Sequence, residues 1–510
     1  MALAKLYSAA VTGLDAEPVE IEIDITRGKV LFILVGLPDK VVEESKERVR
    51  SAIKNSGGHF PQERLTINLA PADLRKEGPV FDLGIALGIL QASGQIRFDA
   101  TKTIILGELS LDGKLRRVSG VLPIAEMAVK RGFDTMLVPK ENFFEANIIP
   151  GLKIVAGESL ADFIHYFAGH NNIKAEESGQ RIELEDEETA YQYDFAYIKG
   201  QNQAKRALEI AAAGGHNVLM SGPPGSGKTL LARSFPSVLP RMALSEALEV
   251  TKIYSVAGIL PPGEALIKKR PFRSPHHTTS AVAIVGGGTH PRPGEISLAH
   301  RGVLFLDEFP EFPRFVLEVL RQPLEDGLIN VSRASGSATY PAKFTLLAAQ
   351  NPCPCGYLTD PTKPCVCSSS TISRYQKKIS GPLLDRIDLH IEVPRVEYQQ
   401  LAEKKIAEES SVIRARVQKA RDIQAERFIV LTKKIVSNGE MGSAEITRFC
   451  ALTEPATMLL KNAVNQMHLS ARGYHRVLKL ARTIADLDGA EIVDQKHIAE
   501  ALQYRSREKG

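Results

Sequence analysis

The segment Gly222–Thr229 constrains the fold of this chain more than any other feature, because it fits the pattern G-x-x-x-x-G-K-[ST]. It follows a short apolar run, Asn217–Ser221, and precedes a helical pattern. Glycines in such a loop let backbone N–H groups converge on phosphates at a helix N-terminus. The residues predicted to bind the nucleotide are Gly222, Pro223, Pro224, Gly225, Ser226, Gly227, Lys228, Thr229 and Leu230.

A second motif lies about 75 residues further on, where the apolar run Val303–Leu306 ends in the carboxylates Asp307 and Glu308. Parallel strands deliver such acids to a crevice at one edge of a sheet. We expect Lys228 to reach the outer phosphates, Thr229 and Asp307 to hold Mg²⁺, and Glu308 to orient the attacking water. The two motifs together predict hydrolysis of a nucleoside triphosphate.

The chain divides into zones of different composition. Its 510 residues exceed what one compact core usually holds. Residues 1–170 mix strand and helix patterns, residues 171–190 are acidic and typical of a linker, residues 191–395 carry the nucleotide motifs, and residues 396–510 are almost wholly helical. We therefore predict an α/β protein with a small first domain, a parallel-sheet nucleotide domain and a helical lid.

The overall charge and hydropathy exclude few functions. The net charge of +4 does not indicate whether the protein binds nucleic acid. The N-terminus lacks the pattern of a signal peptide, and no stretch approaches the roughly 20 apolar residues of a membrane span. We expect a cytoplasmic protein without a membrane partner.

Four of the five cysteines cluster in a loop directly after Asn351. They form two C-x-C pairs, Cys353 with Cys355 and Cys365 with Cys367. In a reducing compartment such a cluster indicates a metal before disulfides, and four thiolates favour a closed, structural zinc site. Unliganded or redox-labile thiols are the alternative. Cys450 is expected in the core.

Other segments carry a resemblance to a known family. Gly200–Leu208 and Leu298–Glu308 resemble motifs of the magnesium-chelatase-like AAA+ ATPases, and within that group the chain resembles the ComM (YifB) family over nearly its whole length. The first domain resembles the Lon-protease-like domain through Lys76–Pro79 and Gly107–Leu115. Active Lon domains carry a serine where this chain has Val80, and an alkyl group cannot act as a nucleophile. Peptidase activity is therefore expected to be absent.

The resemblance implies further catalytic residues and ATP as the nucleotide. Asn351 is similar to the sensor amide at the end of a buried strand, although it could simply form a turn before Pro352. Arg386 is similar to an arginine finger that acts on a neighbouring subunit, and a surface salt bridge is the alternative. Arg472 is similar to the second arginine sensor, with Arg476 as the fallback. A finger acting in trans requires an oligomer, and the family implies a homo-hexamer.

Two segments, residues 256–297 and 329–343, line the ring's pore in the relatives. Their hydroxyl and basic groups suit a sugar-phosphate backbone. For residues 329–343, the alternative is a hairpin that only supports the nucleotide site and does not contact DNA. The residues predicted to contact DNA are His276, His277, Thr278, Arg333, Ser335 and Lys343.

The resemblance therefore implies a hexameric ATPase that moves on single-stranded and branched DNA, as a branch-migration helicase in homologous recombination and natural transformation. A magnesium-chelatase-type subunit is one alternative, although the fused Lon-like domain argues against it. An ATP-dependent protease is disfavoured by Val80. A protein-remodelling ATPase would share every motif of the nucleotide site.

Overall fold

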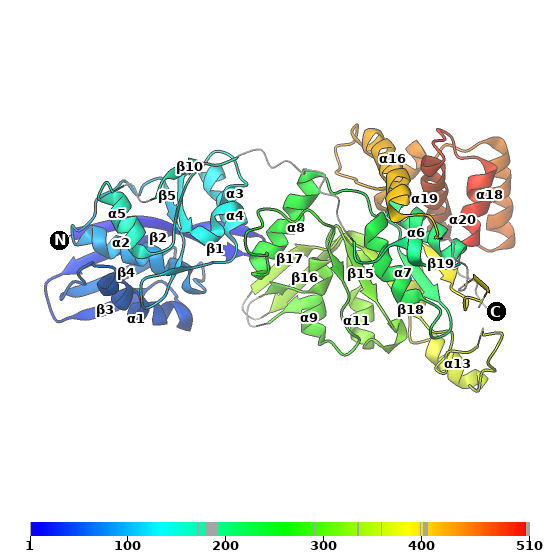
Figure 1. Ribbon diagram of the computed structural model, residues 1–510, viewed down its shortest axis with the longest axis horizontal. Helices are drawn as coiled ribbons and strands as arrows, with labels where there is room; N and C mark the ends of the chain where they lie inside the picture. Colours follow the sequence, from blue (N-terminus) through cyan, green and yellow to red (C-terminus); the bar gives the residue numbers. More distant parts are fainter. Residues whose placement is uncertain are drawn as a thin grey trace.

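The computed structural model describes residues 2–170, 173–179, 191–288, 291–333, 336–358, 360–397, 399–400 and 406–505. The molecule is elongated, with the N-terminal α/β domain at one end, a parallel-sheet domain in the middle and helices α16 to α20 beyond it (Figure 1). The predicted α/β class, with a parallel sheet and a helical C-terminal region, is confirmed.

The first domain is an eight-stranded mixed sheet in the order β10-β9-β8-β5-β1-β2-β4-β3. Its strands are β1 (Ala2–Thr12), β2 (Asp15–Thr26), β3 (Leu31–Val35), β4 (Arg64–Ala70), β5 (Thr103–Ile105), β8 (Thr135–Pro139), β9 (Lys153–Gly157) and β10 (Ala175–Glu177), with a separate hairpin of β6 (Glu108–Leu109) and β7 (Leu115–Arg116). Its helices are α1 (Lys40–Asn55), α2 (Asp82–Ala92), α3 (Val121–Arg131), α4 (Phe143–Ala146) and α5 (Leu160–Phe167).

The acidic segment predicted as a linker, residues 171–190, is partly structured. Ala175–Glu177 pair antiparallel with β9 and extend the sheet by one exposed edge strand. The side chains of these residues are exposed to solvent, so backbone hydrogen bonds to β9 hold them in the sheet. Residues 171–172 and 180–190 of this segment lie outside the described part of the chain.

The middle domain is built on a five-stranded parallel sheet in the order β12-β15-β18-β11-β19. Its strands are β11 (Val218–Ser221), β12 (Phe272–Arg273), β15 (Val303–Leu306), β18 (Thr345–Gln350) and β19 (Leu389–Glu392), accompanied by the hairpins β13 (Gly286–Gly287) with β14 (Arg292–Pro293) and β16 (Leu328–Arg333) with β17 (Gly336–Pro341). Its helices are α6 (Asn202–Gly214), α7 (Lys228–Ser234), α8 (Leu244–Ala257), α9 (Ala281–Val285), α10 (Glu295–Leu298), α11 (Arg314–Val319), α12 (Arg321–Asp326), α13 (Ser369–Gln376) and α14 (Gly381–Leu384).

Alternate residues of the central strands face two different cores. Val303 and Phe305 of β15 join the core shared with α6 and the C-terminal helices, while Leu304 and Leu306 join the core under β16 and β17. A strand buried on both faces reads as an unbroken apolar run, which is why these strands were recognisable in the sequence.

The C-terminal region consists of α16 (Ser410–Phe428), α17 (Ser443–Phe449), α18 (Glu454–Gln466), α19 (Ala471–Leu487) and α20 (Gln495–Gln503). Single 3₁₀ turns occur at η1 (Pro79–Phe81), η2 (Lys140–Asn142), η3 (Phe195–Tyr197), η4 (Phe235–Val238), η5 (Phe309–Glu311) and η6 (Asn438–Glu440). Helices α16 and α19 pack on α6, so the lid and the sheet domain share one hydrophobic core.

The first two domains also contact each other directly. The N–H of Gly120 donates to the carbonyl of Ser255 at 3.1 Å, and Lys252 pairs with Glu126 at 2.8 Å, which joins α3 to α8. The turn between β1 and β2 reaches the hairpin β16–β17, because a Cβ placed on Gly13 would lie 3.5 Å from the Cβ of Ala338, and Leu14 packs against the core beneath these strands.

Candidate nucleotide-binding site

The phosphate loop and the acidic motif meet at one edge of the parallel sheet. Strands β11, β15 and β18 are neighbours, so their carboxyl ends bring Gly222, Asp307 and Asn351 to the same edge. Helix α7 starts at Lys228, and Gly227 before it has φ +93°, a left-handed value that favours glycine. The strand–loop–helix order therefore aims the first N–H groups of α7 into this crevice.

Lys228 is buried and is held by oxygen acceptors. Its Nζ donates to the carbonyls of Gly222 at 2.7 Å and Pro223 at 2.9 Å, and it lies 3.3 Å from Oδ1 of Asn351. Burial lowers the pKa of Lys228, and the carboxylate of Asp307 opposes that effect. A buried ammonium whose hydrogen-bond acceptors are neutral oxygens is suited to bind the anionic phosphates of ATP.

The pair Thr229 and Asp307 fits a magnesium ion. The Thr229 hydroxyl donates to Oδ2 of Asp307 at 2.7 Å, so the two oxygen ligands predicted for Mg²⁺ are adjacent. When bound, Mg²⁺ would neutralise charge on the outer phosphates. Oδ1 of Asp307 accepts from the N–H of Glu308 at 2.9 Å, which fixes the carboxylate.

Glu308 lies next to a residue of the predicted pore segment. Its backbone has φ +52°, uncommon for a residue other than glycine, and its side chain is 56% exposed. Oε2 of Glu308 lies 3.2 Å from Nδ1 of His277. His277 in turn packs against His276, with ring centroids 4.1 Å apart, and His276 bonds to the Thr278 hydroxyl at 2.8 Å. The predicted water-orienting carboxylate is thus in contact with the predicted DNA-binding segment.

The residue before α6 also reaches the phosphate loop. Gln201 adopts φ +57°, and its amide Nε2 donates to the carbonyl of Pro394 at 2.6 Å and to that of Ser226 at 3.3 Å. The Gly200–Leu208 segment therefore lies against the loop, where the resemblance places a contact to the nucleotide base.

The four clustered cysteines come together in space. The Sγ atom of Cys353 lies 3.3 Å from that of Cys355 and 3.6 Å from that of Cys365, and all four sulfurs, including that of Cys367, are within 4.8 Å of one another. The backbone N–H groups of Tyr357 and Val366 point to the sulfur of Cys355 and lower its pKa to about 6. Donors aimed at a sulfur favour the thiolate form, which is the form that binds metals. The donor set fits a tetrahedral zinc ion.

The predicted arginines lie at the other end of the central strand. Arg386 and Arg472 both bind Glu325 of α12; Nη2 of Arg472 is 2.9 Å from Oε1, and Nη2 of Arg386 contacts Oε2. The carbonyl of Arg386 accepts from the side chain of Asn217, which precedes β11, whereas Lys228 follows that strand. At about 3.3 Å per residue, the five residue steps from Asn217 to Gly222 separate the two sites by roughly 16 Å. The arginines therefore do not belong to the phosphate site of their own chain.

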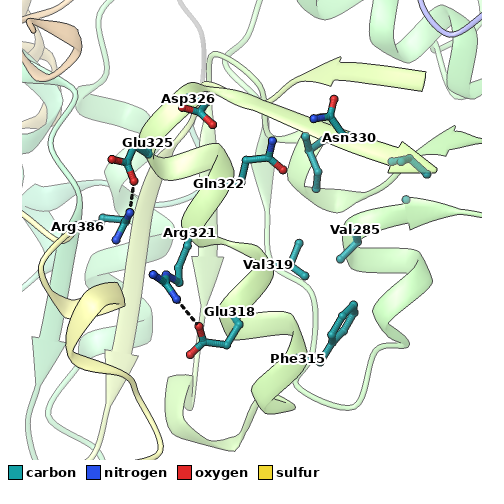
Figure 2. A pocket seen from close by; sticks show the side chains of 13 residues that line it. Val285, Phe315, Glu318, Val319, Arg321, Gln322, Glu325, Asp326, Asn330 and Arg386 are labelled. Carbon is teal, nitrogen blue, oxygen red and sulfur yellow. Dashed lines mark hydrogen bonds and ion pairs between the residues drawn. The ribbon is translucent and has the colours of Figure 1, made fainter. Parts of the chain in front are cut away.

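Glu325 and Arg386 line a hollow on this face, shown in Figure 2. A second ion pair, Arg321 with Glu318 at 3.0 Å, lies in the same hollow but does not contact Arg386 (Figure 2). Phe315 and Leu328 of this region are exposed, with 65% and 42% of their surface accessible. Exposed apolar side chains around paired charges are typical of a surface that contacts a partner.

A cavity of about 600 Å³ between the sheet domain and the lid adjoins the same two arginines. Its walls carry nine Lys or Arg side chains against six Asp or Glu, so it favours anions. Two guanidinium nitrogens near it, Nε of Arg386 and Nε of Arg421, are buried without a hydrogen-bond partner. Arg476, the fallback sensor, donates to the carbonyl of Ile387 at 2.7 Å in the same region.

The remaining predicted DNA contacts lie in different places. Lys343 follows β17 and its Nζ pairs with Glu440 of the lid at 2.8 Å, so it is not presented at the hairpin tip. Ser335 and the side chain of Arg333 lie outside the described residues. Val80, where active Lon domains carry serine, is partly buried and packs against both cores of the first domain.

Sequence reasoning missed three features of the site: Glu325 as the shared partner of two arginines, the contact of His277 with Glu308, and the packing of Gly356 in the cysteine loop against Pro224. The contact between His277 and Glu308 follows from the sheet, because His277 comes soon after β12, Glu308 comes soon after β15, and these two strands are neighbours. Glu325 and Gly356 belong to no sequence motif that would have indicated their contacts. Across the described ranges, no helix has the length and apolar character needed to cross a membrane.

Comparison with known proteins shows the family of this chain. Residues 194–401 match the family model described as magnesium chelatase, subunit ChlI, residues 407–505 match its C-terminal model, and residues 21–142 match a model of subunit ChlI of Mg-chelatase. The chain is 44% identical to competence protein ComM of Haemophilus influenzae, over 99% of this chain and 98% of that protein. It is 41% identical to YifB of Escherichia coli, over 99% and 97%. It is 25% identical to the magnesium-chelatase 38 kDa subunit of Rhodobacter capsulatus, over 62% of this chain and 88% of that subunit.

Proposed function

This chain belongs to the ComM and YifB family of magnesium-chelatase-like AAA+ ATPases, and on that premise we propose that it is a ring-forming, ATP-driven motor that moves branch points in DNA. The relative from Haemophilus influenzae is named a competence protein, which suggests work on incoming DNA during transformation and recombination. ATP and Mg²⁺ are the reactants for which the phosphate loop is built.

The observation that carries the proposal is the contact between His277 and Glu308. His277 lies in the segment that would grip a DNA backbone, and Glu308 is the residue that would orient the attacking water. A strand that displaces the His276–Thr278 segment changes the hydrogen bonding of Glu308, so DNA and hydrolysis are coupled through one side chain. This coupling is what a translocating motor requires.

The arginine face supports a ring. Since Arg386 and Arg472 lie about 16 Å along β11 from their own phosphate loop, a complete catalytic site needs the arginines of a neighbouring copy. An anion-attracting cavity beside them, with two unpartnered guanidinium nitrogens nearby, suits the triphosphate of the next subunit. A hexamer is the ring size implied by the family.

In catalysis each group has a separate task. The phosphate-loop N–H groups and Lys228 bind the outer phosphates, the amide N–H of Asn351 donates to the γ-phosphate or its water, and Glu308 holds the attacking water in line. Arg386 from the neighbour stabilises the charge that develops on the transferred phosphoryl group.

The decisive experiment measures the ATPase rate with no DNA, with single-stranded DNA and with a four-way junction, each across a salt series. We expect junction and single-stranded DNA to stimulate the rate, with the stimulation falling as salt rises. Conversion of a labelled four-way junction should require ATP and be lost in Glu308→Gln. A rate independent of DNA at all salt concentrations would favour a chelatase-type or protein-remodelling role instead.

A further inference from the structure

The loop that carries the four cysteines is packed against the phosphate loop. Gly356 has φ +84°, and a Cβ placed on it would lie 2.5 Å and 2.6 Å from Cδ and Cγ of Pro224. These distances are far below any normal carbon–carbon contact, so the backbone of Gly356 lies directly on the Pro224 ring. Only glycine allows this approach.

The same loop is continuous with the sensor. Asn351 is two residues before Cys353, and its Oδ1 accepts from Lys228 at 3.3 Å. A Cβ on Gly356 would also lie 3.8 Å from Cγ of Asn351. The cysteine loop therefore contacts both the residue predicted to sense the γ-phosphate and the loop predicted to bind the phosphates.

The loop is held by turns and side-chain contacts rather than by a helix or strand. Residues 352–358 and 360–367 form no helix or strand, and Val366 is 84% exposed. The described cysteines are not disulfide-bonded, and their sulfur separations of 3.3 Å and 3.6 Å exceed the roughly 2.05 Å of an S–S bond. A tetrahedral zinc ion with Zn–S bonds of about 2.3 Å would place the sulfurs about 3.8 Å apart, close to the observed spacing.

We propose that Cys353, Cys355, Cys365 and Cys367 hold a zinc ion, and that this metal centre fixes Asn351 and the phosphate loop in position for ATP hydrolysis. The zinc ion then affects the rate of ATP hydrolysis by holding these groups in place, and it takes no direct part in the reaction. This inference rests on the ATPase part of the proposed function and is independent of whether the substrate is DNA.

The first measurement is metal content, by mass spectrometry of the full-length protein. We expect about one zinc per chain in the unmodified protein and none in the double variant Cys353→Ser, Cys365→Ser. The double variant should hydrolyse ATP about 10- to 100-fold more slowly in the absence of DNA, since a small misplacement of positioning groups costs this much. No zinc in the unmodified protein, or loss of zinc with an unchanged rate, would overturn the proposal.

A second set of variants tests the contact without touching the sulfurs. Gly356→Ala should retain zinc but lower the ATPase rate, because the added methyl group pushes the cysteine loop away from Pro224. Adding Pro224→Ala removes the ring atoms it meets and should restore much of the rate. Gly489→Ala is the matched control, since Gly489 has φ +67° and nothing within 4 Å of its Cβ position.

These variants keep the proposal testable even if the cysteine variant does not fold. A Gly356→Ala protein as active as Gly489→Ala would refute the mechanical contact, and so would a defect that Pro224→Ala leaves unchanged. All rates are measured without DNA, so a failed DNA stimulation does not affect the outcome.

Discussion

Glu325 is predicted to restrain Arg386 and Arg472, which we propose act on a neighbouring subunit. It binds Arg386 through one carboxylate oxygen and Arg472 through the other, and 48% of its side chain is exposed. For either arginine to reach a neighbour's phosphate, its bond to Glu325 must break. We expect Glu325→Gln, which keeps the shape and removes the charge, to raise the ATPase rate of the assembled protein.

The size of the effect follows from the exposure of the pair. Glu325 and Arg472 are each 48% exposed, whereas Arg386 is only 11% exposed. Solvent-exposed ion pairs contribute about 0.2–1 kcal/mol each, so releasing both arginines costs roughly 1 kcal/mol or somewhat more. Since about 1.4 kcal/mol corresponds to a factor of ten, the rate should rise about three- to tenfold, and less at high salt.

The assay is the steady-state ATPase rate over a range of protein concentrations, so that assembly and turnover are separated. Glu318→Gln is the control, because Glu318 pairs with Arg321 in the same hollow and lies apart from Arg386 (Figure 2). If Glu325→Gln instead lowers the rate as far as Arg386→Ala does, Glu325 holds Arg386 in its active position and the restraint model is wrong.

Three other changes test the site and the fold. Lys228→Ala should lose ATP binding, whereas Glu308→Gln should keep ATP but turn it over at least about 100-fold more slowly; equal loss of binding in both variants, measured with a fluorescent ATP analogue, contradicts the assigned roles. Mixing inactive Arg386→Ala and Lys228→Ala subunits should restore part of the ATPase rate at mixed interfaces, and no recovery at any ratio would argue against a finger in trans. Burial and the nearby Arg476 lower the pKa of His390 to about 4. Between pH 6.5 and 4 the imidazole of His390 therefore binds a proton in the unfolded chain but not in the folded chain. Acidification to pH 5 should therefore cost roughly 2 kcal/mol of stability, and His390→Asn should reduce this pH dependence of the urea midpoint; an unchanged dependence would show that His390 is not responsible.

The parts of the fold that could be predicted were those with strong local patterns. Val303–Leu306 and Thr345–Gln350 are buried on both faces, so their apolar runs marked strands without any knowledge of the sheet. The phosphate loop carries its own motif. Ala175–Glu177 could not be recognised, because an exposed edge strand is held by backbone bonds that acidic side chains do not reveal.

The sequence indicated contacts between two recognisable motifs and missed contacts that involve a segment without a motif. Thr229 and Asp307 were paired correctly in space because a phosphate loop and an acidic strand imply each other. The partner of Arg386, by contrast, is 61 residues away on α12, and nothing in the residues around Glu325 distinguishes it from other exposed acids. The position of Lys343 beside Glu440 depends on how the lid folds back, which local composition does not encode.

The long β1–β2 ribbon connects the first domain to the hairpin β16–β17 of the middle domain. Eleven paired residues run along it, and its tip, Gly13–Leu14, rests on the hairpin β16–β17 predicted to line the pore (Figure 1). With α3 clamped to α8 as a second anchor, the hairpin cannot swing far without bending the ribbon or dragging the domain behind it. On the proposed function, the first domain therefore limits how far the hairpin can move in each cycle of ATP hydrolysis.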